Sequence, residues 1–272
     1  MNRTMKACAS LFKMRVAENL QYRAAALANS CISIFWGLMQ IVMFTVFFTM
    51  GDASGAAMTL PQAVSYAWLV QISLGFIGRL GLDGEIREKI KSGDVALDLC
   101  RPLDLYAHWY SKTIALRVGG SVWRAVITLI AAVVVPAAFR LSPPVSALGF
   151  VLFLISVCSG VFLCAAFAMF LSAVRVGLTW GEGPTYIFEM IAMFLSGSCF
   201  PLQLWPDFMQ RFLLLQPFAS LMDIPFRLYL GLISPGESFW AMGLQLFWTV
   251  AFIAAGKLLL NRRVSKLIVQ GG

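Results

Sequence analysis

Residues 146–172 read SALGFVLFLISVCSGVFLCAAFAMFLS, and this stretch decides the fold class. It lies within 34 consecutive uncharged residues (141–174), between Arg140 and Arg175. A helix that crosses the hydrocarbon core of a bilayer needs about 20 largely apolar residues. The stretch is therefore predicted to be a membrane-spanning helix.

Five further stretches have the length and apolar character of spans. They lie near 26–50, 61–81, 106–136, 184–200 and 238–256. Two of them, 106–136 and 184–200, contain charges well away from their ends, which a span tolerates where they face protein or water. The predicted fold class is an all-α integral membrane protein with six transmembrane helices in a single domain over residues 1–272.

The composition places the chain in the membrane class. Of its 272 residues, 60% are hydrophobic and 12% are charged, whereas an ordinary soluble domain carries about 25% charged residues. The six cysteines have neither paired nor zinc-ligand spacing, so we expect free thiols. With one histidine, His108, and no convergent carboxylates, we expect no metal site and no catalytic residue. The first apolar stretch is longer than the apolar region of a signal peptide, so we expect an uncleaved first span.

The basic residues predict the orientation. Of the 21 lysines and arginines, Arg117 and Arg124 lie deep inside a predicted span, and Arg140, Arg211 and Arg227 lie in outer segments if the N-terminus is cytosolic. The other sixteen then lie on the cytosolic side, which is the positive-inside asymmetry. Six spans therefore place both termini in the cytosol.

The N-terminal residues 1–24 have the pattern of an amphipathic helix. Met5, Cys8, Phe12, Val16 and Leu20 recur at three- and four-residue spacing, and the basic residues lie off that stripe. Such a helix lies in the headgroup layer, with its basic residues toward anionic lipid. The alternative is a basic tail that only directs topology.

The cytosolic loop 83–104 reads DGEIREKIKSGDVALDLCRPLD. Asp83 suits the cap of a short helix that carries Ile86 and Ile90 on one face, and Gly93 suits its left-handed end. Asp94 suits the cap of a second short helix from Val95 to Leu99. Two such helices would form a rigid docking element, but the residues alone are equally compatible with a solvated hairpin.

Residues 200–236 are apolar but interrupted by prolines. Pro201, Pro206, Pro217 and Pro225 exclude one continuous spanning helix. Pro206 suits the first turn of a short helix that Pro217 would end, and a second helix is predicted over 218–230. We expect re-entrant helices on the outer side, which dip into the membrane and return.

Three charges lie deep inside predicted spans, away from the inner ends where Arg79 and Lys112 lie. Arg117 and Arg124 are seven residues apart, so they lie on nearly one face of a helix, and Glu189 lies in the fifth span. Ionisable residues inside a membrane usually have a partner. We expect a salt bridge from Glu189 to Arg124 or Arg117; a contact with substrate is the alternative, and Arg117 is also compatible with a place near the inner interface.

Two stretches carry a resemblance to a known family. SGSCFP (196–201), a Trp-Pro step at 205–206 and QPFASLMDIPFRLYLG (216–231) precede the last span, and IREKIKSGDVALDLCRPLD (86–104) separates spans two and three. In this order the chain resembles the permease family of ABC-2-type exporters, in its branch of single-domain six-span subunits. The resemblance covers essentially the whole chain.

The resemblance implies that the loop between spans two and three couples the permease to a separate ATPase. Packing on the ATPase would fall to Ile86, Ile90 and Val95. The other coupling residues would be Glu85, Arg87, Lys89, Gly93, Asp94 and Asp98.

The resemblance also implies partners and a location. Two permeases, identical or homologous, would pair in the lipid of a bacterial cytoplasmic (inner) membrane above an ATPase dimer that binds ATP and Mg. This chain has no GxxxxGK[ST] loop, so it would bind no cofactor and would not itself be an enzyme. The exported compound would be hydrophobic, amphipathic or cationic, and we expect no nucleic-acid partner. A secondary transporter and a non-transporting membrane scaffold are the alternatives.

Overall fold

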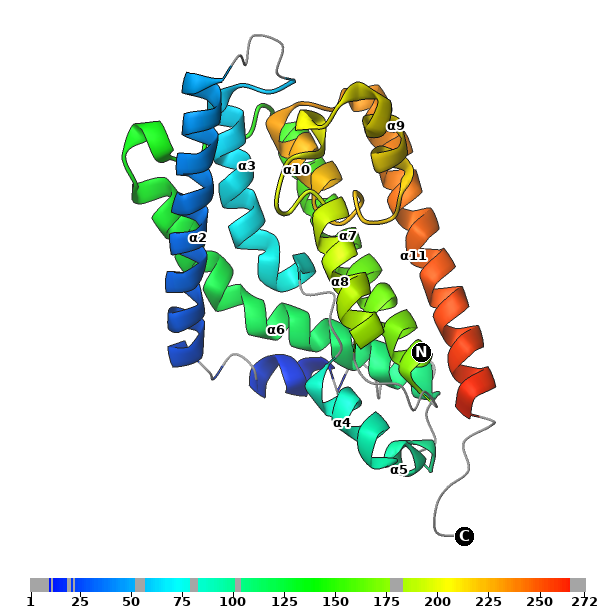
Figure 1. The fold of residues 1–272 in the computed structure, drawn as a ribbon. Helices are drawn as coiled ribbons and strands as arrows, with labels where there is room; N and C mark the ends of the chain where they lie inside the picture. The colour runs from blue at the N-terminus through cyan, green and yellow to red at the C-terminus, as the bar shows by residue number, and fades with distance from the viewer. Residues whose placement is uncertain are drawn as a thin grey trace.

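A computed structural model describes residues 10, 12–18, 21, 23–51, 57–78, 83–100, 104–176 and 183–264. Within these ranges the chain forms helices and turns and no strand (Figure 1). The all-α prediction is confirmed for this part of the chain.

Five helices form a bundle and are long and apolar enough to cross a membrane. They are α2 (Arg23–Met50), α3 (Leu60–Ser73) with its π-helical extension η1 (Leu74–Gly78), α6 (Leu105–Val134), α7 (Ala147–Arg175) and α11 (Pro235–Val264). They match five of the six predicted spans. Arg117 and Arg124 do not interrupt α6, because both side chains are buried within the protein.

The predicted span 184–200 is shorter than expected. The corresponding helix, α8 (Gly183–Leu195), has 13 residues, or roughly 20 Å at 1.5 Å per residue. Its end is set by Gly197, which has φ 82°, and by the hydroxyls of Ser196 and Ser198, which both donate to the Met193 carbonyl. Because the hydrocarbon core is about 30 Å thick, the count of six spans stays a prediction.

Aromatic side chains fill the space between the long helices. Tyr66 on α3 packs edge-on against Phe226, with ring centroids 5.2 Å apart. Phe167 on α7 makes the same contact with Phe218 and with Phe252 on α11, at 5.2 and 5.3 Å. Edge-to-face contacts at these distances are the favoured geometry of aromatic pairs, so the rings join the elements that follow α8 to the centre of the bundle.

A buried amide joins the same elements through polar contacts. The Gln245 side chain on α11 donates to the carbonyls of Ser156 on α7 (2.9 Å) and Ser220 (2.7 Å), and it accepts from the Ser156 hydroxyl (3.1 Å). Every polar atom of this amide therefore has a partner, as a buried amide requires.

The proline-rich segment folds into short helices, at the end of the bundle opposite α4 and α5 (Figure 1). They are η3 (Leu202–Leu204), α9 (Asp207–Leu215) and α10 (Asp223–Leu230). Pro201 and Pro206 stand at the N-caps of η3 and α9, and Pro217 follows the C-cap of α9. Pro225 lies in the first turn of α10, where no backbone N–H is needed.

The predicted second helix of this segment, 218–230, begins later than expected, at Asp223. The Gln216 side chain accepts from the Phe218 N–H at 2.7 Å, and the Leu221 N–H bonds to the Phe218 carbonyl. These contacts hold 216–221 in turns instead of a helix.

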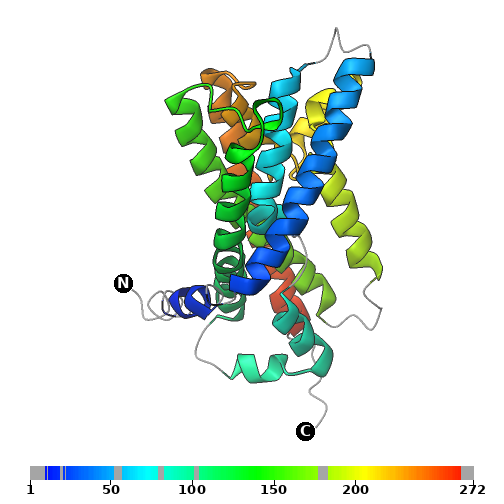
Figure 2. The same ribbon diagram turned by 90° about the vertical axis from the view of Figure 1, so that its left-hand side faces the viewer.

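The N-terminal helix crosses the foot of the bundle. Residues 12–18 are helical and lie across the direction of the long helices (Figure 2). Phe12 and Val16 are half-buried and Lys13 is exposed, as the amphipathic pattern predicts. Met5, Cys8 and Leu20 of the same prediction lie outside the described residues.

Candidate functional site: the helical platform at the foot of the bundle

The loop between α3 and α6 folds into two short helices, α4 (Gly84–Ser92) and α5 (Val95–Leu99), which we call the platform. Asp83 caps α4, accepting the Glu85 N–H at 2.8 Å. Gly93 ends it with φ 82°, a conformation that only glycine adopts without strain. Asp94 occupies the N-cap of α5, but its side chain makes no capping bond there and instead accepts the Ser92 hydroxyl at 2.7 Å.

The apolar face of the platform packs against the protein's own helices. Ile86 and Val95 are 1% and 2% exposed, and Ile90 packs against the same cluster. The buried residues that surround them come from α6, from α7 and the residue that follows it, and from α11. These are Tyr106, Trp109, Met169, Ala173, Val176 and Leu260. In this structure Ile86, Ile90 and Val95 therefore pack within the chain, which removes their apolar surface from water. Their packing on an ATPase stays a prediction.

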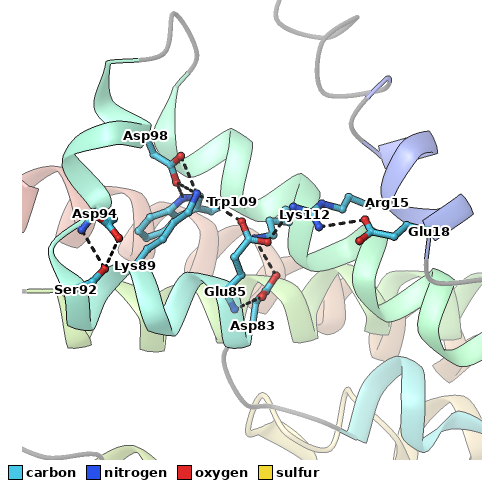
Figure 3. Close-up of polar contacts among 10 residues, drawn as sticks. All are labelled: Arg15, Glu18, Asp83, Glu85, Lys89, Ser92, Asp94, Asp98, Trp109 and Lys112. Carbon is cyan, nitrogen blue, oxygen red and sulfur yellow. Dashed lines mark hydrogen bonds and ion pairs between the residues drawn. The ribbon is translucent and has the colours of Figure 1, made fainter. Parts of the chain in front are cut away.

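Asp98 joins α5 to both α4 and α6. Its carboxylate is 2% exposed and accepts from Lys89 Nζ at 2.9 and 2.8 Å and from Trp109 Nε1 at 2.9 Å (Figure 3). Burial raises the pKa of Asp98, but the bonds from Lys89 and Trp109 outweigh it and hold the pKa below its ordinary value. The carboxylate is thus charged at neutral pH and fully engaged inside the chain.

Glu85 joins the platform to two other elements. It pairs with Lys112 on α6 at 2.6 Å, with Arg15 of the N-terminal helix at 2.9 Å and with Lys89 at 3.6 Å (Figure 3). Partial burial raises the pKa of Glu85, but the bond and charge of Lys112, with the other two cations, lower it further than burial raises it. Lys112 also lies 3.7 Å from Asp83. The network fixes α4 between the N-terminal helix and α6.

The exposed side chains of the platform belong to a different set of residues. Glu88, Lys91 and Asp94 are exposed, and so are Leu97 (67%) and Leu99 (44%). We call these five the outer face of the platform. Of the predicted coupling residues, Gly93 and Asp94 lie on this side, Arg87 is half-buried, and Glu85, Lys89 and Asp98 are bound within the chain.

Sequence reasoning did not identify Arg15, Trp109 and Lys112 as partners of the platform. Helical spacing indicated which residues of α5 lie together, since Val95 and Asp98 are three residues apart and share a face that excludes Leu97. Nothing in the spacing indicated which face would turn inward.

The intramembrane arginines lie deep in the bundle. Arg117 and Arg124 are 6% and 7% exposed. A Cβ at Gly75 of η1 would lie 2.6 Å from Arg124 Nη2 and 2.4 Å from Ser121 Oγ, so this glycine makes room for the guanidinium. Glu189 is half-buried on α8, and its pairing with either arginine stays a prediction. Within the described ranges no group of three His, Cys, Asp or Glu could hold a metal ion.

A second buried carboxylate lies at the opposite end of the bundle. Asp223 is fully buried and accepts from the Leu202 N–H at 3.2 Å and from Tyr66 Oη at 3.3 Å, and Arg227 lies 3.8 Å away. Burial raises its pKa to about 6, against the opposing effects of Arg227, Leu202 and Tyr66. Tyr66 also bonds to the Gly197 carbonyl at 2.9 Å, so this network ties α3 to the segment after α8.

Comparison with known proteins identifies the family. A family model described as ABC-2 family transporter protein matches residues 34–271. No curated protein and no solved structure matches the chain significantly. The match covers the platform, the proline-rich segment and nearly all of the helical bundle, and it confirms the resemblance seen in the sequence. The chain is a multi-pass membrane protein that belongs to the ABC-2 transporter family.

Proposed function

We propose that the chain is the membrane-spanning permease subunit of an ABC-2 exporter and that it is energised by separate ATPase subunits. The outer face of the platform carries this proposal. It presents two exposed leucines, Leu97 and Leu99, among charges of both signs, on helices that are fixed to the bundle. An apolar centre with a polar rim is the usual composition of a protein interface.

The attachment of the platform suits the transmission of force. Ile86 and Val95 pack on α6, α7 and α11, and Asp98 and Glu85 bind Trp109 and Lys112 of α6. A displacement of α4 and α5 by a partner would therefore move the long helices, because Ile86, Val95 and Asp98 are buried against them. In this role the inward residues transmit the movement and the outer face receives it.

The proposal includes the partners and the direction. An ATPase dimer would bind ATP and Mg and dock on the platform, and a second permease, identical or homologous, would complete the path through a bacterial inner membrane. Both termini and the platform would be cytosolic, in keeping with the charge asymmetry of the sequence. The exported compound would be hydrophobic, amphipathic or cationic.

Capture of the ATPase tests the proposal. The full chain is co-expressed with the ABC ATPases of its source organism and purified from membranes, and the co-purified protein and its ATP hydrolysis are measured. Leu97→Asp is expected to reduce ATPase capture tenfold or more, because burying a leucine is worth about 1.5–3 kcal/mol and each 1.4 kcal/mol is tenfold in affinity. The matched control is Leu215→Asp, at an exposed leucine of α9, which is expected to leave capture unchanged.

The outcomes separate the function from the docking surface. If the unmodified chain captures no ATPase whose hydrolysis depends on it, the proposed function is wrong, and a secondary transporter or a scaffold is favoured. If capture occurs and Leu97→Asp does not weaken it, the permease function stands and the assignment of the outer face is wrong.

A further inference from the structure

A groove opens between the N-terminal helix, α6 and α7. Phe12 and Lys13 form one end of its lining, and the walls come from the two long helices. The wall residues are Ser111, Ile114 and Val118 of α6, and Cys158, Val161 and Phe162 of α7. Its volume is about 570 Å³, within the roughly 300–1,000 Å³ of ligand pockets.

The groove has the shape of an acyl-chain site. From Ser111 to Val118 its α6 wall spans eight residues, or roughly 10 Å at 1.5 Å per step, and the lining side chains of α6 beyond Ser111 are apolar. It runs from the N-terminal helix toward the middle of α7, where Cys158 and Phe162 are exposed at the outside of the bundle. Because its lining beyond Lys13 and Ser111 is apolar and it opens to the outside of the bundle, the groove suits a flexible hydrocarbon chain of the surrounding lipid.

Lys13 gives the groove a charged end. The neighbouring cations are neutralised within the chain, since Arg15 pairs with Glu18 and Glu85, and Lys112 pairs with Glu85. Lys13 is exposed, and no described carboxylate lies within ion-pair distance of it. A cation with no carboxylate partner among the described residues lies here beside an apolar groove, where the N-terminal helix crosses the foot of the bundle. This arrangement is complementary to an anionic headgroup with its acyl chain.

We infer that this groove binds one anionic phospholipid, with an acyl chain between α6 and α7 and the headgroup phosphate at Lys13. The inference rests on membrane insertion and is independent of the proposed transport function. The bound lipid fills the space under the N-terminal helix, whose Arg15 holds Glu85 of the platform. The lipid thereby supports the platform from the side.

Lipid retention by the purified full chain tests the site. The chain in detergent is titrated with dioleoyl phosphatidylglycerol or dioleoyl phosphatidylcholine, and retained lipids are counted by native mass spectrometry. Phosphatidylglycerol is expected to be retained at lower concentration than phosphatidylcholine. Lys13→Gln is expected to weaken phosphatidylglycerol retention about fivefold, the factor for ~1 kcal/mol of attraction per basic residue, and to leave phosphatidylcholine unchanged.

Two further variants define the specificity. Lys257→Gln removes a cation that is already paired with Asp104 at 3.4 Å, so it is expected to leave retention unchanged. Val118→Trp fills the apolar part of the groove and is expected to abolish retention of the specific lipid. Equal retention of the two lipids, or equal losses in Lys13→Gln and Lys257→Gln, would overturn the inference.

Photocrosslinking gives a second readout that requires no bulky substitution. Phosphatidylglycerol with a diazirine on its acyl chain is expected to label peptides containing 111–118 and 158–162 more strongly than the matching phosphatidylcholine probe, and Lys13→Gln is expected to remove that excess. Labelling spread evenly over the bundle would show only annular lipid, and crosslinks from these residues to another protein would show a protein occupant. Either result would refute the site.

Discussion

Replacing Asp98 with alanine is expected to release the platform from the bundle while leaving the long helices in place. Asp98 is 2% exposed and receives three hydrogen bonds, two from Lys89 and one from Trp109. Its carboxylate links α5 to both α4 and α6 through polar contacts, beside the apolar packing of Val95.

The size of the effect follows from the two donors, Trp109 and Lys89, that Asp98→Ala leaves without their acceptor. Trp109 is fully buried, and a buried donor without its acceptor costs about 1–3 kcal/mol. Breaking a buried ion pair costs about 3–5 kcal/mol, but the Lys89 side chain is 22% exposed and water replaces part of its lost contact. We therefore expect the free energy that holds the platform closed to fall by about 3 kcal/mol.

Hydrogen exchange measures this quantity directly. The amides of α4 and α5 exchange when the platform opens, so ~3 kcal/mol corresponds to about 150-fold faster exchange. Amides of α7 are expected to be unchanged, because the opening is local. In the assembled complex the same variant is expected to uncouple ATP hydrolysis from transport, since the platform would move without the bundle.

Two variants complete the test. Asp98→Asn keeps an acceptor for Trp109 but loses the charge, so its exchange rate is expected between those of wild type and alanine. Asp94→Asn, at an exposed carboxylate that binds only Ser92 among the contacts described above, is expected to change stability by less than about 0.5 kcal/mol. The reasoning is refuted if Asp98→Ala leaves platform exchange within twofold of wild type, or if Asp94→Asn has the same effect.

The remaining predictions concern the stability of the detergent-solubilised chain, measured as its apparent Tm. Burial raises the pKa of Asp223 to about 6. The stability that this carboxyl contributes to the folded state is therefore full below pH ~4 and is lost as pH rises through about 6. Asp223→Asn should flatten the plot of apparent Tm against pH between pH 4 and 8, and an unchanged slope would contradict this. Gly197 has φ 82°, and a Cβ there would lie 2.4 Å from Tyr66 Oη, so Gly197→Ala should destabilise by about 2 kcal/mol or more; Gly243→Ala, with nothing within 4 Å, should not. Ile86→Ala should cost about 2–5 kcal/mol in the exchange assay of the platform, and a cost below ~1 kcal/mol would show that its packing is not needed.

The sequence predicted most of the helices because the bilayer imposes a simple length and polarity rule. An uncharged stretch of 20 or more residues can satisfy its backbone groups in lipid within itself only as a helix, so 146–172 required no tertiary information. The two ends of α4 could also be predicted from the sequence, since Asp83 and Gly93 act on their own neighbouring backbone. The exception was 184–200, where the left-handed turn at Gly197 ends the helix earlier than its apolar composition suggests.

The direction in which the platform faces was decided by the tertiary structure. Ile86 and Leu97 are both apolar residues of short amphipathic helices, and their local sequences do not distinguish the one that is 1% exposed from the one that is 67% exposed. Trp109, Lys112 and Arg15 make that choice, from positions up to 70 residues away along the chain. The sequence by itself determined a set of membrane-spanning helices and a loop with helix caps between two of them. Only the packing of the N-terminal helix, α6, α7 and α11 determined which residues of that loop are bound to the bundle and which are exposed, because burial is a property of contacts between distant segments.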